Sequence, residues 1–151
     1  RVKISSRSAA AQGRSAAVDA VRDAKALGIP KGRPIYYNLE AYRSSDASCR
    51  KAVLVFLHHW SVKLKSLKYV SGVYSSIGSG IRDLARAKGI RRPSVIWFAH
   101  WDGKPAYTHP YIPYELWRPH RRIKQYRGGH KETHGGVTIN IDSNYVDSRV
   151  Y

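Results

Sequence analysis

The segment RPIYYNLEAY, residues 33–42, places an amide and a carboxylate two positions apart at the end of an apolar run. Because the side chains of a strand alternate between its two faces, Tyr36, Asn38 and Glu40 are expected to point the same way. A carboxyl group can give or take a proton, whereas an amide only forms hydrogen bonds. The end of this strand is therefore the first candidate for a functional site.

Polar and aromatic side chains also lie at the ends of the other predicted strands. They are Tyr74 to Ser76, His100 to Asp102, Gln125 with Tyr126, and Asp142 with Asn144. In parallel α/β sheets and barrels, ligands bind at the edge formed by the carboxyl ends of the strands. We therefore expect a binding site at this edge.

Apolar spacing predicts alternating strands and helices over the first two thirds of the chain. Strands are expected over 34–40, 69–76 and 93–101, and helices over 14–27, from the capping residues Ser44 to Asp46 as far as Leu67, and over 78–89. This order favours parallel neighbouring strands with right-handed crossovers. Residues 1–13 are small, polar and basic, and they are expected to be a flexible segment or a cut end before a domain that spans 14–151.

The last third of the chain has less predicted helix. Residues 102–122 contain four prolines and are expected to form a long loop. Two short strands, 123–128 and 136–144, are expected after it, separated by residues 129–135. The chain therefore offers five strand candidates.

The chain of 151 residues is strongly basic, with 27 Lys and Arg against 10 Asp and Glu and a formal net charge of +17. A charge of that size attracts polyanions, such as nucleic acid or the acidic polymers of a bacterial envelope. No apolar run reaches the length of about 18 residues that a membrane span needs. The sequence begins with Arg1 and not with methionine, and no signal-peptide pattern follows. We therefore interpret its N-terminus as a processed end or as a cut inside a longer product.

Common metal-binding and nucleophile patterns are missing from the sequence. The single Cys49 excludes an internal disulfide and a multi-cysteine metal site, and it is expected to pack on a helix. His58 and His59 are adjacent on a predicted helix, so they do not share a face as i, i+4 ligands do. The segment YSSIGSG has neither the nucleophile elbow of a serine hydrolase nor the lysine of a P-loop. We therefore expect no metal and no cofactor.

Five ordered motifs resemble a known family. IYYNLEAY, SGVYSS, IWFAHWDG, QY and GGVTINIDSNYVD are similar to the glycoside-hydrolase-like domain of actinobacterial secreted proteins, a relative of the family 25 lysozymes that cleave peptidoglycan. The resemblance runs from about Gly13 to Asp147. It implies a secreted or cell-wall-associated protein whose partner is cell-wall glycan or an anionic envelope polymer.

The fold that this resemblance implies is an α/β fold of the (β/α)8 TIM-barrel type. A complete barrel needs at least about 200 residues, so five strand candidates are too few to close one. The stretch corresponds to roughly strands four to eight of the family pattern. We therefore expect only the C-terminal five strands in this chain, either as a fragment or completed by a segment outside it; a degenerate open fold is the remaining alternative.

The resemblance also implies catalytic roles. Glu40 matches the glutamate of an Asp-x-Glu pair and is the implied general acid, close to the aromatic side chains of Tyr36, Tyr74 and Trp97. Asp142 matches the aspartate of the final strand, which stabilises developing positive charge or orients the acetamido group of the substrate or a water molecule.

Asn38 stands where the family pattern has an aspartate. An amide can hydrogen-bond an acetamido group or a hydroxyl, but it cannot balance the charge of an oxocarbenium-like centre. Flat apolar rings pack well on sugar rings, which implies stacking by the aromatic residues of this edge. The expected substrate-binding residues are Asn38, Tyr36, Tyr74, Trp97, Trp101, Gln125, Tyr126 and Asn144.

Three functions stay open on the sequence. The first is a glycoside hydrolase of the lysozyme-like muramidase type that uses Glu40 and Asp142, and the second is a non-catalytic carbohydrate-binding protein on the same scaffold. The third, a basic nucleic-acid-binding domain, is less favoured because the chain lacks the interleaved aromatic and basic residues of a single-strand groove. The first two differ in whether glycan is cleaved, and the third in whether DNA competes with wall polymer.

Overall fold

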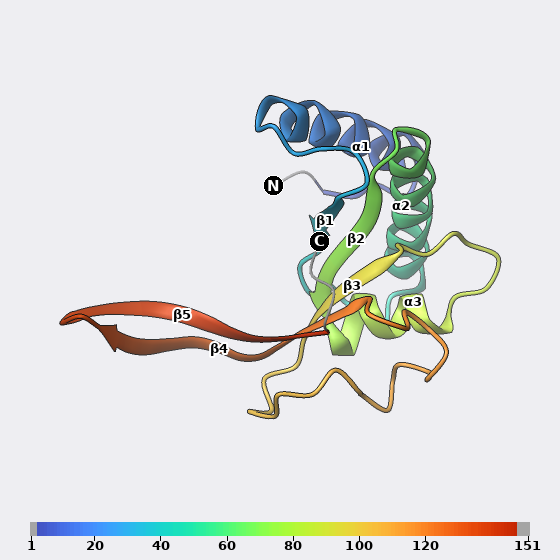
Figure 1. Cartoon of the computed structure of the whole chain (residues 1–151). Helices are drawn as coiled ribbons and strands as arrows, with labels where there is room; N and C mark the ends of the chain where they lie inside the picture. The colour runs from blue at the N-terminus through green and yellow to red at the C-terminus, as the bar shows by residue number, and fades with distance from the viewer. Residues whose placement is uncertain (1–2, 148–151) are drawn as a thin grey trace.

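Five strands form one curled sheet in the order in which they follow along the chain (Figure 1). The computed structural model describes residues 3–147; residues 148–151, the end of the predicted domain, lie outside the described part. The strands are β1 (Pro34–Asn38), β2 (Val70–Ser76), β3 (Val95–Ala99), β4 (Arg122–His134) and β5 (Val137–Val146). The helices are α1 (Ala9–Ala26), α2 (Ala47–Ser66) and α3 (Arg82–Arg86), the last preceded by the π-helical turn η1 (Ile77–Ile81).

Neighbouring strands from β1 to β4 are parallel, as the alternation of strands and helices predicted. The register pairs Asn38 with Tyr74, Tyr74 with Trp97, and Ala99 with Gln125. The candidate residues at the ends of these strands therefore share one edge of the sheet. Within residues 3–147, β1 pairs only with β2 and β5 only with β4, so the sheet is a half-barrel that does not close.

The last two strands differ from the prediction. Residues 129–134, expected as part of a separating loop, continue β4, and β5 returns antiparallel to it. Gly135 and Gly136 join the two strands with φ angles of 55° and 82°, which only glycine adopts easily and which match the twist of a two-residue hairpin. The prediction was wrong here because a mostly polar strand carries no clear hydrophobic period. The resulting hairpin projects far from the rest of the molecule (Figure 1).

Helix α1 begins at Ala9, where a flexible segment was expected as far as residue 13. Its buried residues keep helical spacing over the whole length, and they are Ala9, Gly13, Ala17, Val21 and Ala24. Gly13 allows the close crossing with α2, because a Cβ there would lie 2.3 Å from the carbonyl oxygen of Phe56. Small side chains weaken the hydrophobic signal of a helix, which explains the missed first turns. No helix within residues 3–147 combines the length and the apolar character of a membrane span.

The two faces of β1 are divided as the alternation predicted. Tyr37 packs on α2, with its ring centroid 4.6 Å from that of Phe56 and 5.4 Å from that of Trp60. Tyr36 lies on the opposite face, with its ring centroid 6.2 Å from that of Trp97. Helical spacing in the sequence predicts an apolar stripe of Val53, Leu57, Trp60, Leu64 and Leu67 on α2. The first four lie in the core between the sheet and the helices, and Leu67 is partly buried against it. The sheet face opposite the helices is therefore left to build the site.

The long loop between β3 and β4 is organised by one buried cation. Arg122 is only 2% exposed, and its guanidinium donates hydrogen bonds to the carbonyl oxygens of Tyr107, Pro113, Tyr114 and Leu116. A guanidinium offers five N–H donors in one plane, so it can satisfy several carbonyl groups of a segment without regular structure. The loop is thereby held against the start of β4.

Candidate functional site

Three aromatic rings meet on the sheet face opposite the helices. Trp97 of β3 packs edge-on against Tyr36 of β1 and Tyr74 of β2, with centroid distances of 6.2 and 5.1 Å. Gly72 makes room for the Tyr36 ring, because a Cβ at this position would come within 2.6 Å of it. The structure thus brings together three of the predicted substrate-binding residues from three neighbouring strands.

The side chain of Gln125 is the centre of a hydrogen-bond network at the carboxyl edge of the sheet. Its Oε1 accepts from the Tyr74 hydroxyl at 2.9 Å and from Trp101 Nε1 at 2.8 Å. Its Nε2 donates to Asp142 Oδ2 at 2.9 Å. Gln125 is buried, so loss of the amide would leave polar groups without partners. One amide therefore positions two aromatic side chains and a carboxylate.

Asp142 reaches this edge through an irregularity in the hairpin. The pairing of β4 with β5 shifts between Arg127 and His130, and Asp142 lies across from the two glycines between them. The backbone N–H of Gly129 donates to Asp142 Oδ1 at 2.7 Å, while Gln125 holds the other oxygen. Bulges of this kind commonly redirect a side chain beside a functional site. The carboxylate is fixed in orientation at both oxygens.

The two tryptophans of the site are held by their indole N–H groups. Trp97 Nε1 donates to Asn144 Oδ1 at 2.8 Å, and Trp101 Nε1 donates to Gln125. The Trp101 ring rests on Gly128, where a Cβ would come within 2.4 Å of a ring atom. Trp101 is nevertheless 66% exposed. A fixed ring with much of its surface open to solvent is well placed to stack on a flat ligand.

Glu40 and Asp142 both influence the phenol of Tyr74. Burial raises the pKa of the Tyr74 hydroxyl, the negative charges of Asp142 and Glu40 raise it further, and the hydrogen bond to Gln125 lowers it. The geometry agrees: Glu40 lines a cavity together with Tyr74, and Gln125 links the Tyr74 hydroxyl to the Asp142 carboxylate. The structure therefore brings the two predicted catalytic residues to the same part of the edge.

Two cavities adjoin Glu40, whose side chain is exposed. One, of about 500 Å³, is shared with Tyr74, His100 and Trp101. The other, of about 660 Å³, is lined by Asn38, Tyr42 and Cys49 among others. These volumes are within the range of small-molecule sites. Glu40 thus stands between an aromatic cavity and one that contains the amide of Asn38.

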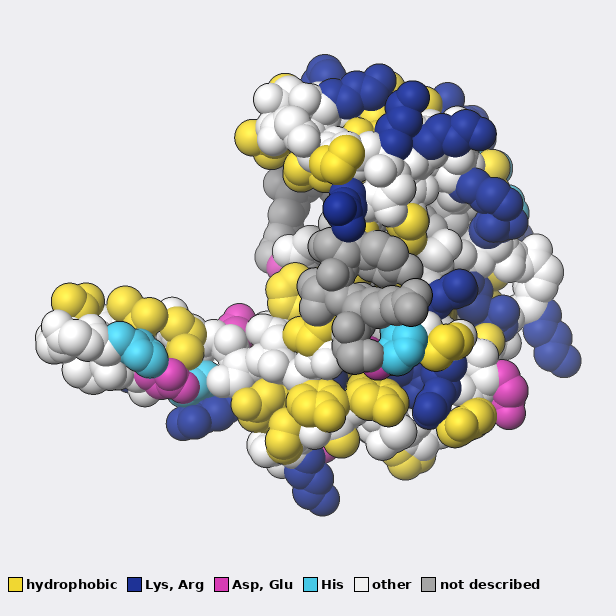
Figure 2. Space-filling view, in the orientation of Figure 1, with side chains coloured by type: hydrophobic (Ala, Val, Ile, Leu, Met, Phe, Trp, Pro, Cys, Tyr) yellow, Lys and Arg dark blue, Asp and Glu magenta, His cyan; other side chains and the backbone are white. Residues whose placement is uncertain are grey.

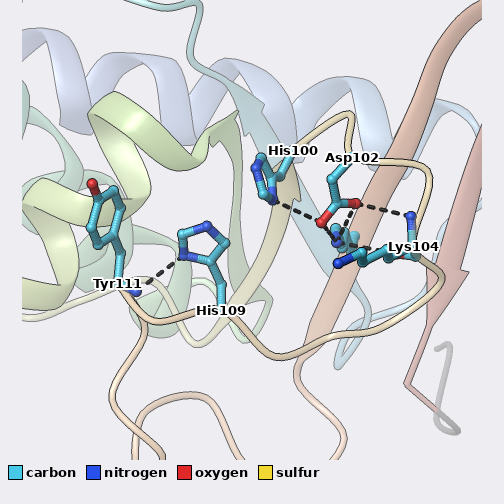
Figure 3. A network of polar contacts seen from close by, with 6 residues as sticks. His100, Asp102, Lys104, His109 and Tyr111 are labelled. Atoms are coloured by element: carbon cyan, nitrogen blue, oxygen red, sulfur yellow. Dashed lines mark hydrogen bonds and ion pairs between the residues drawn. The ribbon is translucent and has the colours of Figure 1, made fainter.

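A polar network beside the site joins His100 and Asp102, which the sequence placed at a strand end, to Lys124 and His109, which it did not single out (Figure 3). Lys124 is buried, and its Nζ donates to both oxygens of Asp102, at 2.8 and 2.9 Å, and to the Lys104 carbonyl at 3.1 Å. His100 Nδ1 lies 3.2 Å from Asp102 Oδ2, and the His109 ring packs edge-on against His100 at 4.7 Å. These contacts fix the start of the loop that carries Trp101.

The pKa values in this network follow from its charges. Burial by itself raises the pKa of Asp102, but the hydrogen bond from Lys124, the backbone N–H of Lys104 and the nearby positive charges outweigh it and lower the pKa to about 2. Burial lowers the pKa of His109, and the charges of His100 and Lys124 lower it further. Asp102 is therefore ionised across the physiological range and serves as an anchor for a buried cation.

Tyr126 is connected to the site through its backbone. Its carbonyl oxygen accepts a hydrogen bond from Gly103 N, which ties β4 to the loop, and a ligand contact of its ring stays a prediction. Among residues 3–147, no group of three or more His, Cys, Asp or Glu side chains is arranged to hold a metal ion. The chemistry available at this edge comes from the carboxylates of Glu40 and Asp142, from the amides of Asn38, Gln125 and Asn144, and from a set of aromatic rings.

Residues 3–146 match the family described as "Rv2525c-like, glycoside hydrolase-like domain", and the chain belongs to this family. A crystal structure of an uncharacterized B. stearothermophilus protein at 1.07 Å is similar to it, with a TM-score of 0.57 and 24% identity over 93% of this chain. The match covers 64% of that protein's chain, and at this identity the likeness concerns the fold alone. No curated protein matches the chain.

Proposed function

We propose that this chain acts on bacterial cell-wall glycan, peptidoglycan or a related amino-sugar polymer, as a lysozyme-like glycoside hydrolase. In this proposal Glu40 is the general acid that protonates the leaving glycosidic oxygen, and Asp142 stabilises developing positive charge or orients the acetamido group or a water molecule. The observation that carries the proposal is that Glu40 lines an aromatic cavity with Tyr74 and Trp101, while Gln125 hydrogen-bonds both of these aromatic side chains and the Asp142 carboxylate. A secreted or wall-associated location is part of the same proposal.

The aromatic surface supports a sugar as the ligand. Pyranose rings present apolar C–H faces, and exposed Trp101 and the rings of Tyr36, Tyr74 and Trp97 offer surfaces for them. The amides of Asn38 and Asn144 can hydrogen-bond hydroxyl and acetamido groups, although Asn144 already accepts from Trp97. We propose that the glycan lies across the cavity that Glu40 shares with Trp101.

A second candidate, a non-catalytic glycan-binding protein, is favoured by Asn38. A carboxylate at this position would contribute negative charge beside Glu40, whereas the amide binds without charge. The binding surface and the hydrogen-bond network are the same in both candidates. They differ in whether the glycosidic bond breaks.

We also propose that the half-barrel is the C-terminal part of a (β/α)8 TIM-type barrel. The parallel order of β1 to β4, with the site at their carboxyl ends, is the arrangement found in such barrels. Within residues 3–147 one edge of β1 has no strand beside it, which offers a place for a further parallel strand. The intact mass of the natural product, compared with 17.1 kDa, tests this, because additional strands require a larger mass.

The test of function is release of reducing ends from purified cell wall by the wild type, Glu40→Gln and Asp142→Asn. Loss of a positioned general acid lowers the rate by roughly a hundredfold or more, so Glu40→Gln should reduce release by that factor while glycan binding remains. Glu115→Gln, at an exposed position in the β3–β4 loop, is the matched control and should keep full activity. Equal release from the wild type and Glu40→Gln would exclude Glu40 as the acid. Binding without release by any variant would support the second candidate.

A further inference from the structure

The edge of the sheet opposite the candidate site collects basic side chains. The chain enters β1 and β2 there, from the segments 27–33 and 67–69. We call the exposed cations in and beside these segments the basic edge: Lys25, Lys31, Arg33, Lys65 and Lys68. The stretches 24–33 and 61–70 contain no carboxylate. Figure 2 shows Lys and Arg side chains gathered over the upper and right-hand parts of the molecule, around α1 and α2, with exposed hydrophobic side chains near the upper left.

Hydrogen bonds join the two segments of the basic edge. Gly32 N donates to the Lys68 carbonyl at 2.8 Å, and the Tyr69 hydroxyl donates to the Ile29 carbonyl at 2.9 Å. Tyr69 is itself buried in the core. The cations on the two segments are therefore carried by one connected piece of backbone that is anchored to the core.

Two apolar side chains are exposed within the basic edge. Leu27 is 77% exposed and Ile29 is 38% exposed. The end of α1 fixes them, because Gly28 has a φ of 71° and its N–H bonds the Lys25 carbonyl, while Ile29 N bonds the carbonyl of Ala24. Aliphatic side chains held among cations have the composition of a segment that binds at a membrane interface.

The helix dipole explains only part of this arrangement. Lys25 and Lys65 lie in the last turns of α1 and α2, where a cation is stabilised by the helix C-terminus. Lys31, Arg33 and Lys68 lie beyond the helices, so the dipole gives no reason for them. It also gives no reason for an exposed leucine at their centre.

We propose that the basic edge docks on an anionic lipid bilayer, with Leu27 and Ile29 in the headgroup region and the cations facing lipid phosphates. A bilayer explains the exposed aliphatic side chains, whereas single-stranded nucleic acid calls for exposed aromatic ones. A flexible anionic polymer offers phosphate but no apolar layer for Leu27. Since Glu40 lies at the other end of the parallel strands, the docked protein turns its candidate site away from the bilayer. This proposal does not depend on glycan cleavage.

The experiment is co-sedimentation of the whole chain with vesicles of phosphatidylcholine alone or mixed with phosphatidylglycerol. Binding is expected only to the anionic vesicles and should weaken with salt, as the Debye length shrinks from about 10 Å at 0.1 M to about 3 Å at 1 M. A juxtamembrane Lys contributes about 1 kcal/mol, or roughly a fivefold change in affinity, so Lys31→Gln/Lys68→Gln should weaken binding roughly 25-fold. Leu27→Ser should weaken it several-fold, because its side chain no longer enters the interface.

Matched controls have the same chemistry at the other end of the molecule. Lys51→Gln/Lys131→Gln removes the same charge, and Val137→Ser removes an aliphatic side chain that is 63% exposed on the hairpin. Both controls should bind anionic vesicles nearly as well as the wild type. The proposal is overturned if the wild type does not sediment with anionic vesicles, or if the control and test lysine pairs weaken binding equally. It is also overturned if Leu27→Ser binds fully and double-stranded DNA competes as strongly as vesicles, which would make the edge a general polyanion surface.

Discussion

Replacing Gln125 by glutamate tests the amide at the centre of the site. Gln125→Glu keeps the side-chain shape and the acceptor for Tyr74 and Trp101, but it puts a carboxyl oxygen where Nε2 lies 2.9 Å from Asp142 Oδ2. When the introduced carboxyl ionises, the hydrogen bond to the Asp142 carboxylate is lost, at a cost of about 1.5–3 kcal/mol. Repulsion between the two charges adds about 1.4 kcal/mol in a water-like medium and about 6 kcal/mol at an effective dielectric constant of about 20.

Even the lower limit predicts a total loss of about 3 kcal/mol in the ionised state. Since one pKa unit corresponds to about 1.36 kcal/mol, the introduced carboxyl should have its pKa raised by about two units in the folded protein. A raised carboxyl pKa means that stability is intact below the unfolded value of about 4.3 and is lost as pH rises through about 6. The variant should therefore become less stable relative to wild type from acid to neutral pH.

The assay is urea unfolding of wild type and Gln125→Glu at about pH 4 and about pH 8, followed by tryptophan fluorescence. We expect similar stability at the lower pH and a deficit of about 3 kcal/mol at the higher one. Gln125→Met loses the hydrogen bonds at both pH values and should show a constant deficit. In Gln125→Glu/Asp142→Asn the repelling charge is gone, so the pH dependence should disappear. A deficit that is equal at both pH values, or that persists in the double variant, would refute the assigned geometry.

Three further perturbations test other parts of the site. Asn38→Asp should raise the rate of glycan cleavage if the amide limits it, measured as released reducing ends, and an unchanged rate would remove Asn38 from the explanation. Gly128→Ala should displace the Trp101 ring, because the added Cβ would overlap with it. Binding of neutral chitin oligomers should then weaken several-fold, since an aromatic contact is worth about 0.5–1.5 kcal/mol. For the same reason Trp101→Phe should bind these oligomers better than Trp101→Ala. The pKa of Asp102, lowered from 3.8 to about 2, means that its pairing with Lys124 stabilises the fold above pH 3.8 and that this contribution is lost as pH falls toward 2. Asp102→Asn should thus be less stable than wild type at neutral pH, by roughly 1–2 kcal/mol after solvent screening, with the gap closing in acid.

Local sequence patterns were enough to predict the parallel part of the sheet and the face that carries the site. Alternation along β1 separates Tyr36, which packs with Trp97, from Tyr37, which packs on α2. Helical spacing likewise predicted the stripe of α2 that covers the sheet. These predictions succeed because side chains repeat with a fixed period along a strand or a helix. Burial of one face therefore places apolar residues at regular intervals in the sequence.

The same reasoning failed where burial leaves no such trace. The small residues at the start of α1 bury little apolar surface, and the outer hairpin of β4 and β5 is mostly exposed, so neither carries a strong hydrophobic period. The one local feature that indicates this hairpin is the pair Gly135 and Gly136, since two glycines between strands favour a tight turn.

Sequence alone placed Glu40 and Gln125 at the carboxyl edge, because residue type and strand position are local properties; Asp142, expected at a strand end, instead lies inside the antiparallel strand β5. Only the tertiary structure decided how they are connected. Tyr74 and Gln125 are 51 positions apart, and Trp97 and Asn144 are 47 apart, so their hydrogen bonds exist only once parallel register and the hairpin bring the strands together. The direction of each bond depends on distances of about 3 Å between atoms of different strands. No periodic pattern within a single strand contains that information, because it is fixed by the packing of strands against one another.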